Sequence, residues 1–189
     1  MNRDDVLLWI LGGAVLAWVL YNRSGIGSTL ETGAETVTAA LTGWQAVNDG
    51  PVWVPVINQT ESAYGIPSML LARQAYQESH FRRAIIEGTQ VSSAGALGIL
   101  QLMPKWFATV NVPVPFTAAD TQAQITEAGK EMARLYAVFA DWGLALAAYN
   151  DGESNVKDYL AGVRALPQET QNYVAQVLAD VPVASVMTA

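Results

Sequence analysis

The chain has 189 residues, and its 10 Lys and Arg against 17 Asp and Glu give a net charge of −7. This acidic balance disfavours nucleic-acid binding, which normally requires a basic surface to neutralise phosphates. The absence of cysteine and the single histidine exclude a disulfide scaffold and a Cys/His metal site, and we expect no metal or cofactor. Only 14% of the residues are charged and 51% are hydrophobic, which indicates a membrane-embedded segment.

Residues 6–21 form an apolar run, VLLWILGGAVLAWVLY. At 1.5 Å per residue such a helix would span about 24 Å, slightly less than a hydrocarbon core of about 30 Å. Trp9, Trp18 and Tyr21 lie near its ends, where interfacial aromatic residues belong. We therefore predict a transmembrane anchor at residues 1–23. The alternatives are a cleaved signal peptide and a buried helix, and the flanking charges do not decide the orientation.

A Gly/Ser/Thr-rich tether is predicted at residues 24–50, a globular domain at 51–182 and a short tail at 183–189. The apolar spacing within the domain predicts helices at 68–79, 121–140, 144–149, 155–161 and 167–179. The second of these helices is expected to begin with a capping box formed by Thr121 and Gln124. Two glycines interrupt the segment 92–104, which we expect to form a loop or a small β-ribbon. The fold class is therefore mainly α.

Glu78 is the best candidate for acid–base chemistry. It ends a predicted helix beside the apolar rings of Tyr76 and Phe81. A helix C-terminus and an apolar environment both raise a carboxyl pKa, as a general acid at neutral pH requires. The alternative is an ordinary helix-terminal glutamate. A triad of His80 with Ser79 is disfavoured, because adjacent side chains on a helix diverge by about 100°.

Four segments carry a family resemblance. They are ESHF at 78–81, SAGALGILQLMP at 93–104, AYNDG at 148–152 and LPQETQNY at 166–173. In this order they resemble the motifs of lytic transglycosylases, whose catalytic domains have a lysozyme-like (goose-type) fold. The resemblance covers about residues 51–179 and does not include the predicted anchor or tether. One position departs from the pattern, because Leu100 stands where the family often has a substrate-contacting methionine.

The resemblance implies a role for each matched residue. Glu78 would protonate the bond between N-acetylmuramic acid and N-acetylglucosamine and then act as a base on the muramic C6 hydroxyl, giving a 1,6-anhydro product. The substrate's N-acetyl oxygen would steady the cationic centre in place of a second carboxylate. The matched substrate-binding positions are Ser93, Gln101, Tyr149, Asn150, Glu169 and Tyr173. The alternative is that Ser93 only shapes a turn and that Tyr173 only fills the core.

These interpretations predict a membrane-tethered lytic transglycosylase with its catalytic domain on the murein-accessible, periplasmic side, or on a virion membrane. Its expected partners are peptidoglycan glycan strands and, through residues 6–21, the membrane; proteins of a virion or envelope complex are further candidates. Phage entry, phage lysis and envelope remodelling are all compatible roles. One alternative is a hydrolytic muramidase that uses Glu87, Asp151 or Glu153 as its second carboxylate. Another is a non-catalytic glycan-binding or structural protein.

Overall fold

The computed structural model describes residues 41–181 and 183, and the chain divides into two units, residues 1–41 and 42–189. The predicted anchor, most of the tether and most of the C-terminal tail lie outside the described residues. No helix within the described part of the chain is both long and apolar enough to cross a bilayer. All the helices of the described residues belong to the second unit.

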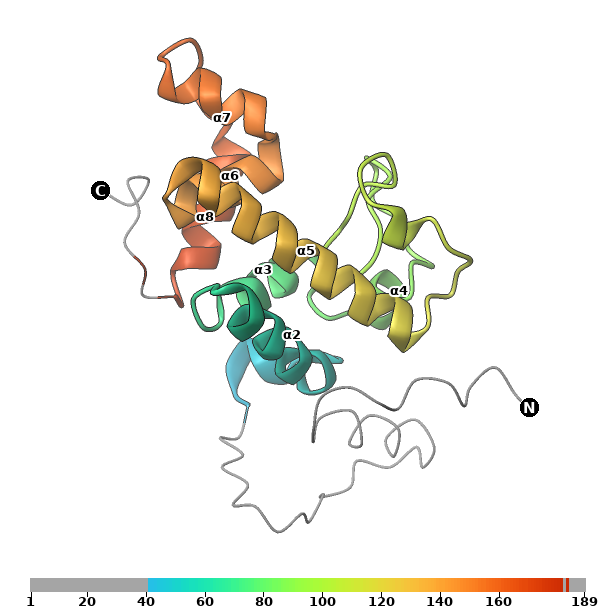
Figure 1. Ribbon diagram of the computed structural model, residues 1–189. Coiled ribbons are helices and arrows are strands. Elements are labelled where there is room, and N and C mark those ends of the chain that lie inside the picture. The colour runs from blue at the N-terminus through green and yellow to red at the C-terminus, as the bar shows by residue number, and fades with distance from the viewer. Residues whose placement is uncertain (1–40, 182, 184–189) are drawn as a thin grey trace, which may run out of the picture. The chain divides into compact units, whose positions relative to one another are not determined.

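Helices dominate this unit, as predicted, and they are connected by short turns and one long loop segment (Figure 1). In chain order they are η1 (Gly43–Ala46), α2 (Gly50–Tyr64), α3 (Leu70–Ser79), α4 (Arg83–Ile86), η2 (Ala108–Val110), α5 (Ala118–Phe139), α6 (Trp142–Asp151), α7 (Glu153–Leu160) and α8 (Gln168–Leu178). The segment predicted as a loop or β-ribbon is a loop. A single antiparallel bridge between Leu97 and Leu102 closes it.

Helix α6 forms the centre of the core. Every residue from Trp142 to Ala148 is buried, so this helix is apolar on all its faces and must be enclosed by others. Helices α5, α7 and α8 pack against it. The Asp141 side chain caps its first turn by accepting a 2.8 Å hydrogen bond from the Leu144 N–H. The helix predicted at 144–149 is longer than expected, because it continues to Asp151, and only Gly152 separates it from α7.

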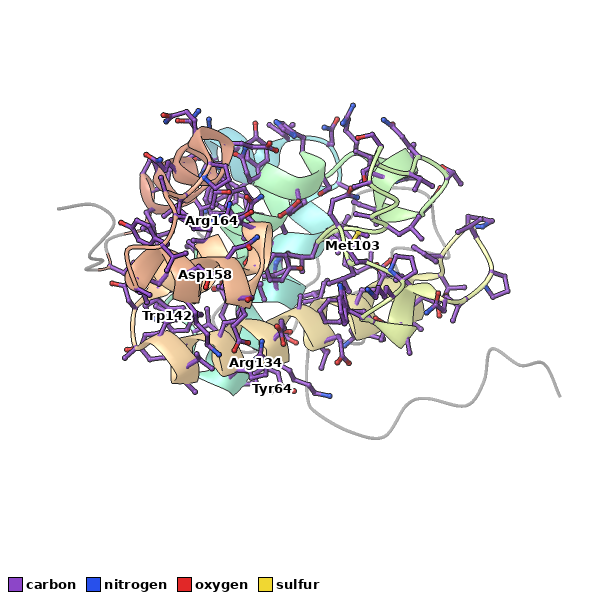
Figure 2. The ribbon with its side chains drawn as sticks, turned by 90° about the horizontal axis from the view of Figure 1, so that it is seen from above. Tyr64, Met103, Arg134, Trp142, Asp158 and Arg164 are labelled. Carbon is purple, nitrogen blue, oxygen red and sulfur yellow. The ribbon has the colours of Figure 1, made fainter. Side chains whose placement is uncertain are left out.

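The long helix α5 connects the two sides of the unit. The loop segment between α4 and α5 lies at one end of this helix, and α6, α7 and α8 gather around the other (Figure 1). The view from above agrees, with Met103 on one side and Trp142 and Asp158 on the other (Figure 2). The predicted start of this helix was wrong. The capping box consists of Thr117 and Asp120, one turn earlier than expected.

The start of the compact unit lies earlier than the predicted domain boundary at residue 51. Residues 43–50 pack with the end of α3, where the Asp49 N–H donates to the Phe81 carbonyl over 3.1 Å. The Asp49 carboxylate also pairs with Arg83 at 3.0 Å. The last residues of the predicted tether therefore belong to the folded unit and help to hold the C-terminal end of α3.

Glu61 holds the other end of α3. Its carboxylate, in α2, is only 1% exposed and accepts hydrogen bonds from the N–H groups of Met69 at 2.7 Å and Ala72 at 2.9 Å. These donors belong to the first turn of α3, where backbone N–H groups lack partners within the helix. One side chain thus fixes the orientation of the helix that carries Glu78.

Candidate active site

Glu78 lies in the last turn of α3, and the next three residues of the motif explain how the helix ends there. Ser79 is completely buried, donates to the Ala75 carbonyl and accepts a hydrogen bond from the Phe81 N–H. His80 and Phe81 both adopt positive φ angles, which turns the chain sharply away. Phe81 then inserts its ring into the core with 0% exposure. Ser79 and Phe81 are therefore structural, and His80 is an exposed helix cap.

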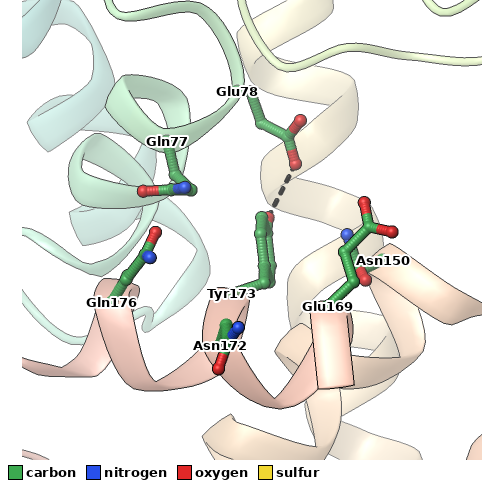
Figure 3. Close-up of a pocket in the computed structure, with 7 residues that line it drawn as sticks. All are labelled: Gln77, Glu78, Asn150, Glu169, Asn172, Tyr173 and Gln176. Atoms are coloured by element: carbon green, nitrogen blue, oxygen red, sulfur yellow. Dashed lines mark hydrogen bonds between the residues drawn. The ribbon is translucent and has the colours of Figure 1, made fainter. Parts of the chain in front are cut away.

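The Glu78 carboxyl is half-buried and held by one strong contact. The Tyr173 hydroxyl, from α8, donates a hydrogen bond to Glu78 Oε1 over 2.7 Å (Figure 3). Burial raises the pKa of Glu78 to about 7, and this hydrogen bond opposes the rise because it favours the ionised form. A carboxyl with such a pKa can give up and regain a proton at neutral pH, as acid–base catalysis requires.

A cavity of about 530 Å³ opens beside this pair, between α3 and α8. Most of its lining side chains are neutral and polar. The lining residues are Gln77, Glu78, Asn150, Glu169, Asn172, Tyr173 and Gln176 (Figure 3). They come from α3, α6 and α8. Amide and hydroxyl groups of this kind can donate and accept hydrogen bonds without adding charge. The cavity therefore suits a neutral, hydroxyl-rich or amide-rich ligand.

The structure brings together four of the seven residues predicted for the site: Glu78, Asn150, Glu169 and Tyr173. Asn150 is held by a residue that the sequence analysis overlooked. Thr170 is only 2% exposed, and its hydroxyl donates to Asn150 Oδ1 over 2.8 Å. This contact fixes the rotation of the Asn150 amide. Glu169, on the first turn of α8, is exposed at the edge of the cavity.

Tyr149 does not line this cavity, but it is close enough for the Glu78 charge to act on it. Burial, with the Glu78 charge as a further cause, raises the pKa of Tyr149 well above its usual value. Its hydroxyl donates to the Leu100 carbonyl over 2.8 Å. Tyr149 thereby connects the central helix α6 to the glycine-containing loop.

The two predicted loop residues, Ser93 and Gln101, are not among the residues that line the cavity. Ser93 is exposed, whereas its neighbour Ser92 accepts a hydrogen bond from the Ala96 N–H and shapes the turn. The Gln101 side chain donates to the Gly98 carbonyl over 3.0 Å. Gly98 has a φ of +77°, and a Cβ there would collide with the side chain of Gln124, so this position requires glycine.

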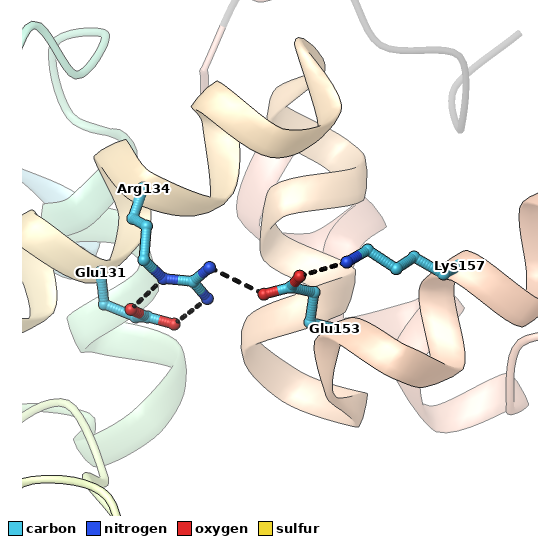
Figure 4. A network of polar contacts seen from close by, with 4 residues as sticks. All are labelled: Glu131, Arg134, Glu153 and Lys157. Atoms are coloured by element: carbon cyan, nitrogen blue, oxygen red, sulfur yellow. Dashed lines mark hydrogen bonds and ion pairs between the residues drawn. The ribbon is translucent and has the colours of Figure 1, made fainter.

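None of the three acids considered as a second carboxylate lines the cavity with Glu78. Asp151 pairs with Arg164 at 3.3 Å. Glu153 joins Arg134 and Lys157 in a surface network between α5 and α7, and these cations lower its pKa (Figure 4). The third acid, Glu87, follows the short helix α4. Glu169 is the other carboxylate that lines the described cavity.

Three cavity residues were missed in the sequence analysis: Gln77, Asn172 and Gln176. Helical spacing could have identified two of them, because Asn172 and Gln176 follow Glu169 by three and seven residues on the same face of α8. Gln77 directly precedes Glu78 in the chain. Among the described residues, no cluster of three or more His, Asp or Glu side chains could hold a metal ion.

Comparisons with known proteins agree with this architecture. The model of the transglycosylase SLT domain family matches residues 55–172. A solved structure of an inactive mutant of the lytic transglycosylase Slt from Pseudomonas aeruginosa superposes with a TM-score of 0.51 and 24% sequence identity. The match covers 66% of this chain but only 22% of that protein, so the likeness concerns the fold of one part of it. Since the family match spans more than half of the sequence and reaches from α2 to α8, the chain belongs to the transglycosylase SLT domain family.

Proposed function

We propose that this chain is a peptidoglycan lytic transglycosylase that cleaves the β-1,4 bond between N-acetylmuramic acid and N-acetylglucosamine. The observation that carries the proposal is the raised pKa of Glu78 at the wall of a polar cavity. Its pKa is raised to about 7, and it opens into a cavity lined mainly by neutral amide and phenol groups. A protonated carboxyl in a neutral polar cavity is suited to deliver a proton to an uncharged glycan.

In the proposed reaction, protonated Glu78 donates its proton to the glycosidic oxygen, and the bond from that oxygen to C1 of the muramic sugar breaks. The resulting Glu78 carboxylate then removes the proton from the muramic C6 hydroxyl. The C6 oxygen attacks C1 and closes the 1,6-anhydro ring. Glu78 ends the cycle protonated, no water is consumed, and the substrate's own N-acetyl oxygen steadies the positive charge at C1.

A hydrolytic muramidase is the second candidate, and Glu169 is the observation that favours it. Glu169 is exposed at the edge of the same cavity as Glu78, so it is available to activate a water molecule. Glycosidases that use water rely on two carboxyl groups on opposite sides of the scissile bond. The two mechanisms differ in their products, because the anhydro sugar is one water lighter than a reducing end.

Mass spectrometry of murein digests tests the proposal. The full chain, in detergent, is incubated with purified murein, and 1,6-anhydromuramic ends are the expected product. Reducing ends alone would replace the proposal with the muramidase, and a lack of any cleavage would favour a non-catalytic glycan-binding or structural role. Glu78→Gln should lower the rate by about 100-fold or more, the usual scale for a lost general acid. Glu127→Gln, an acid on α5 outside the cavity, is the matched control.

The cellular setting is part of the same proposal. The sequence of residues 6–21 supports a single-pass membrane anchor, and the expected substrate places the catalytic unit on the murein-accessible side, either periplasmic or on a virion membrane. Roles in phage entry, phage lysis or envelope remodelling follow from that placement, with virion or envelope proteins as candidate neighbours. Protease accessibility of the domain in intact spheroplasts would report its side of the membrane.

A further inference from the structure

Three amide side chains of the cavity share a pattern that the proposed reaction does not use. Gln77, Asn150 and Asn172 lie on α3, α6 and α8, and all three line the cavity with Glu78. In each of them the side-chain oxygen accepts a hydrogen bond from another residue of the protein. A side-chain amide accepts through its oxygen and donates through its NH₂ group. The pattern therefore occupies the acceptors and leaves the donors for a ligand.

The orientation of the Gln77 amide is fixed by Arg73. Arg73 Nη1 donates to Gln77 Oε1 over 3.4 Å, and a guanidinium group has no acceptor, so the amide must present its oxygen to it. Arg73 is itself held by an ion pair with Asp180 at 2.8 Å. Its guanidinium group also lies over the rings of Trp44 and Tyr76. The Gln77 NH₂ group is therefore directed away from Arg73 and toward the cavity (Figure 3).

The other two amides are held in the same way. The Thr170 hydroxyl donates to Asn150 Oδ1 at 2.8 Å, and the Gln168 amide donates to Asn172 Oδ1 at 3.0 Å. Within the described part of the chain, none of the three NH₂ groups donates to a protein acceptor. The cavity thus offers amide donors from three helices to a ligand that enters it.

A ligand that matches these donors must present acceptor oxygens. Glu78 and Glu169 are acidic and line the same cavity, so the carboxylate of an anionic ligand would be repelled there. A neutral amide carbonyl only accepts hydrogen bonds and adds no charge, and it therefore fits both conditions. Murein carries such carbonyls on the N-acetyl groups of its sugars and on its peptide stems.

We propose that Gln77 is a substrate-binding residue that donates its side-chain N–H to a neutral amide carbonyl of the glycan strand. The inference rests on the proposed function, which supplies the substrate. It adds a residue that lies outside the four segments of the family resemblance. Gln77 and Glu78 line one cavity, so a carbonyl bound by Gln77 is held close to the proposed acid.

Ligand titrations of the full chain in detergent test this contact with two pairs of probes. Triacetylchitotriose is compared with cellotriose, which has the same type of sugar backbone without N-acetyl groups. The disaccharide N-acetylglucosaminyl-N-acetylmuramic acid is compared with and without its peptide stem. These probes lack the bond that the proposed reaction breaks, so binding is measured without turnover. Side-chain ¹⁵N NMR follows the glutamine NH₂ groups, and Gln77→Met assigns the Gln77 signal.

The Gln77 NH₂ signal should shift with triacetylchitotriose but not with cellotriose. Gln77→Met keeps the length of the side chain but removes the donor. It should raise the Kd for triacetylchitotriose about fivefold, the scale of one neutral hydrogen bond, and leave the Kd for cellotriose unchanged. Gln122→Met, at an exposed glutamine of α5 outside the cavity, is the matched control. A shift and a loss of affinity only with the peptide-bearing disaccharide would identify the stem as the source of the carbonyl.

Two results would overturn the proposal. Equal losses of affinity for triacetylchitotriose and cellotriose would show that Gln77 only shapes the cavity. An NH₂ signal that no probe shifts would show that Gln77 does not bind the ligand. Gln77→Leu provides the same comparison if Gln77→Met does not fold. Cleavage is measured separately, so a chain that fails to cleave murein would refute the proposed function while the titrations still decide the role of Gln77.

Discussion

The Tyr173 hydroxyl donates a 2.7 Å hydrogen bond to Glu78 Oε1 and connects two helices whose contacting residues are 95 positions apart in the chain. The two effects on the carboxyl act in opposite directions. Burial raises the pKa of Glu78 and the phenol hydrogen bond lowers it, so that the pKa is about 7. Burial alone would hold the proton too tightly for a base, and solvent exposure would leave too little of the acid at neutral pH. The α3–α8 packing therefore sets both the orientation and the acidity of the group.

Glu78→Gln should change how the stability of the protein depends on pH. The folded-state pKa of about 7 is above the ordinary value of 4.5, so between these values the folded state binds more protons than the unfolded state. The stability of the parent therefore falls as the pH rises through this window, by no more than about 3 kcal/mol. The variant should lack this decrease, and at pH 8 it should be the more stable protein. Urea unfolding at one-unit pH intervals measures both curves, and parallel curves would contradict the raised pKa.

Thr170→Val should lower turnover without unfolding the protein. The substitution keeps the shape of a side chain that is 2% exposed but removes the donor to Asn150 Oδ1. The Asn150 amide is then free to rotate at the cavity edge. The loss of one neutral hydrogen bond, about 1 kcal/mol, predicts a decrease in turnover of about fivefold. Thr170→Ser keeps the hydroxyl and serves as the matched control. Equal rates for the two variants would show that the Thr170 hydroxyl does not support the site.

Glu61→Gln should destabilise the fold. The parent carboxylate accepts from both the Met69 and Ala72 N–H groups, whereas an amide offers only one acceptor oxygen and brings a buried NH₂ without a partner. The expected loss is about 1–3 kcal/mol in the free energy of unfolding, measured by urea denaturation. Glu127→Gln, outside this contact, should change the stability by much less. A near-parental Glu61→Gln would mean that the first turn of α3 does not depend on this side chain.

Local patterns predicted the helices that carry the site with good accuracy. The helix expected at 68–79 is α3 (Leu70–Ser79), and the one expected at 167–179 is α8 (Gln168–Leu178). A proline precedes the first turn of each helix, Pro67 before α3 and Pro167 before α8, and such a residue favours a helix start. The position of Glu78 at a helix end followed from the same signals. Its pairing with Tyr173 depends on how α3 packs against α8, which periodicity does not report.

The errors have equally local causes. Two capping patterns follow each other at the start of α5, Thr117 with Asp120 and Thr121 with Gln124. The second pattern lies inside the helix, where both of its side chains are buried in the core, so the first forms the capping box. Helix α2 was missed because its prolines, Pro51 and Pro55, interrupt the usual helix signal. Helices α4 and η2 are too short for a periodic pattern. Thr170 was missed because its role comes from a contact between α8 and α6.

Deletion of residues 1–23 should release a soluble domain that still cleaves murein. The compact unit begins at Thr42, and the site residues described above all lie after it, so the deletion leaves the unit complete. The uncharged run at 6–21 buries enough apolar surface, at about 25 cal/mol per Å², to make spontaneous release of an inserted helix negligible. The full chain should therefore stay with membranes in a carbonate wash, and the truncated chain should appear in the supernatant with parental activity on murein. A mature N-terminus near Ser24, or a full chain removed by carbonate, would show a cleaved signal instead of an anchor. A folded but inactive truncated domain would show that the removed segment contributes to the site.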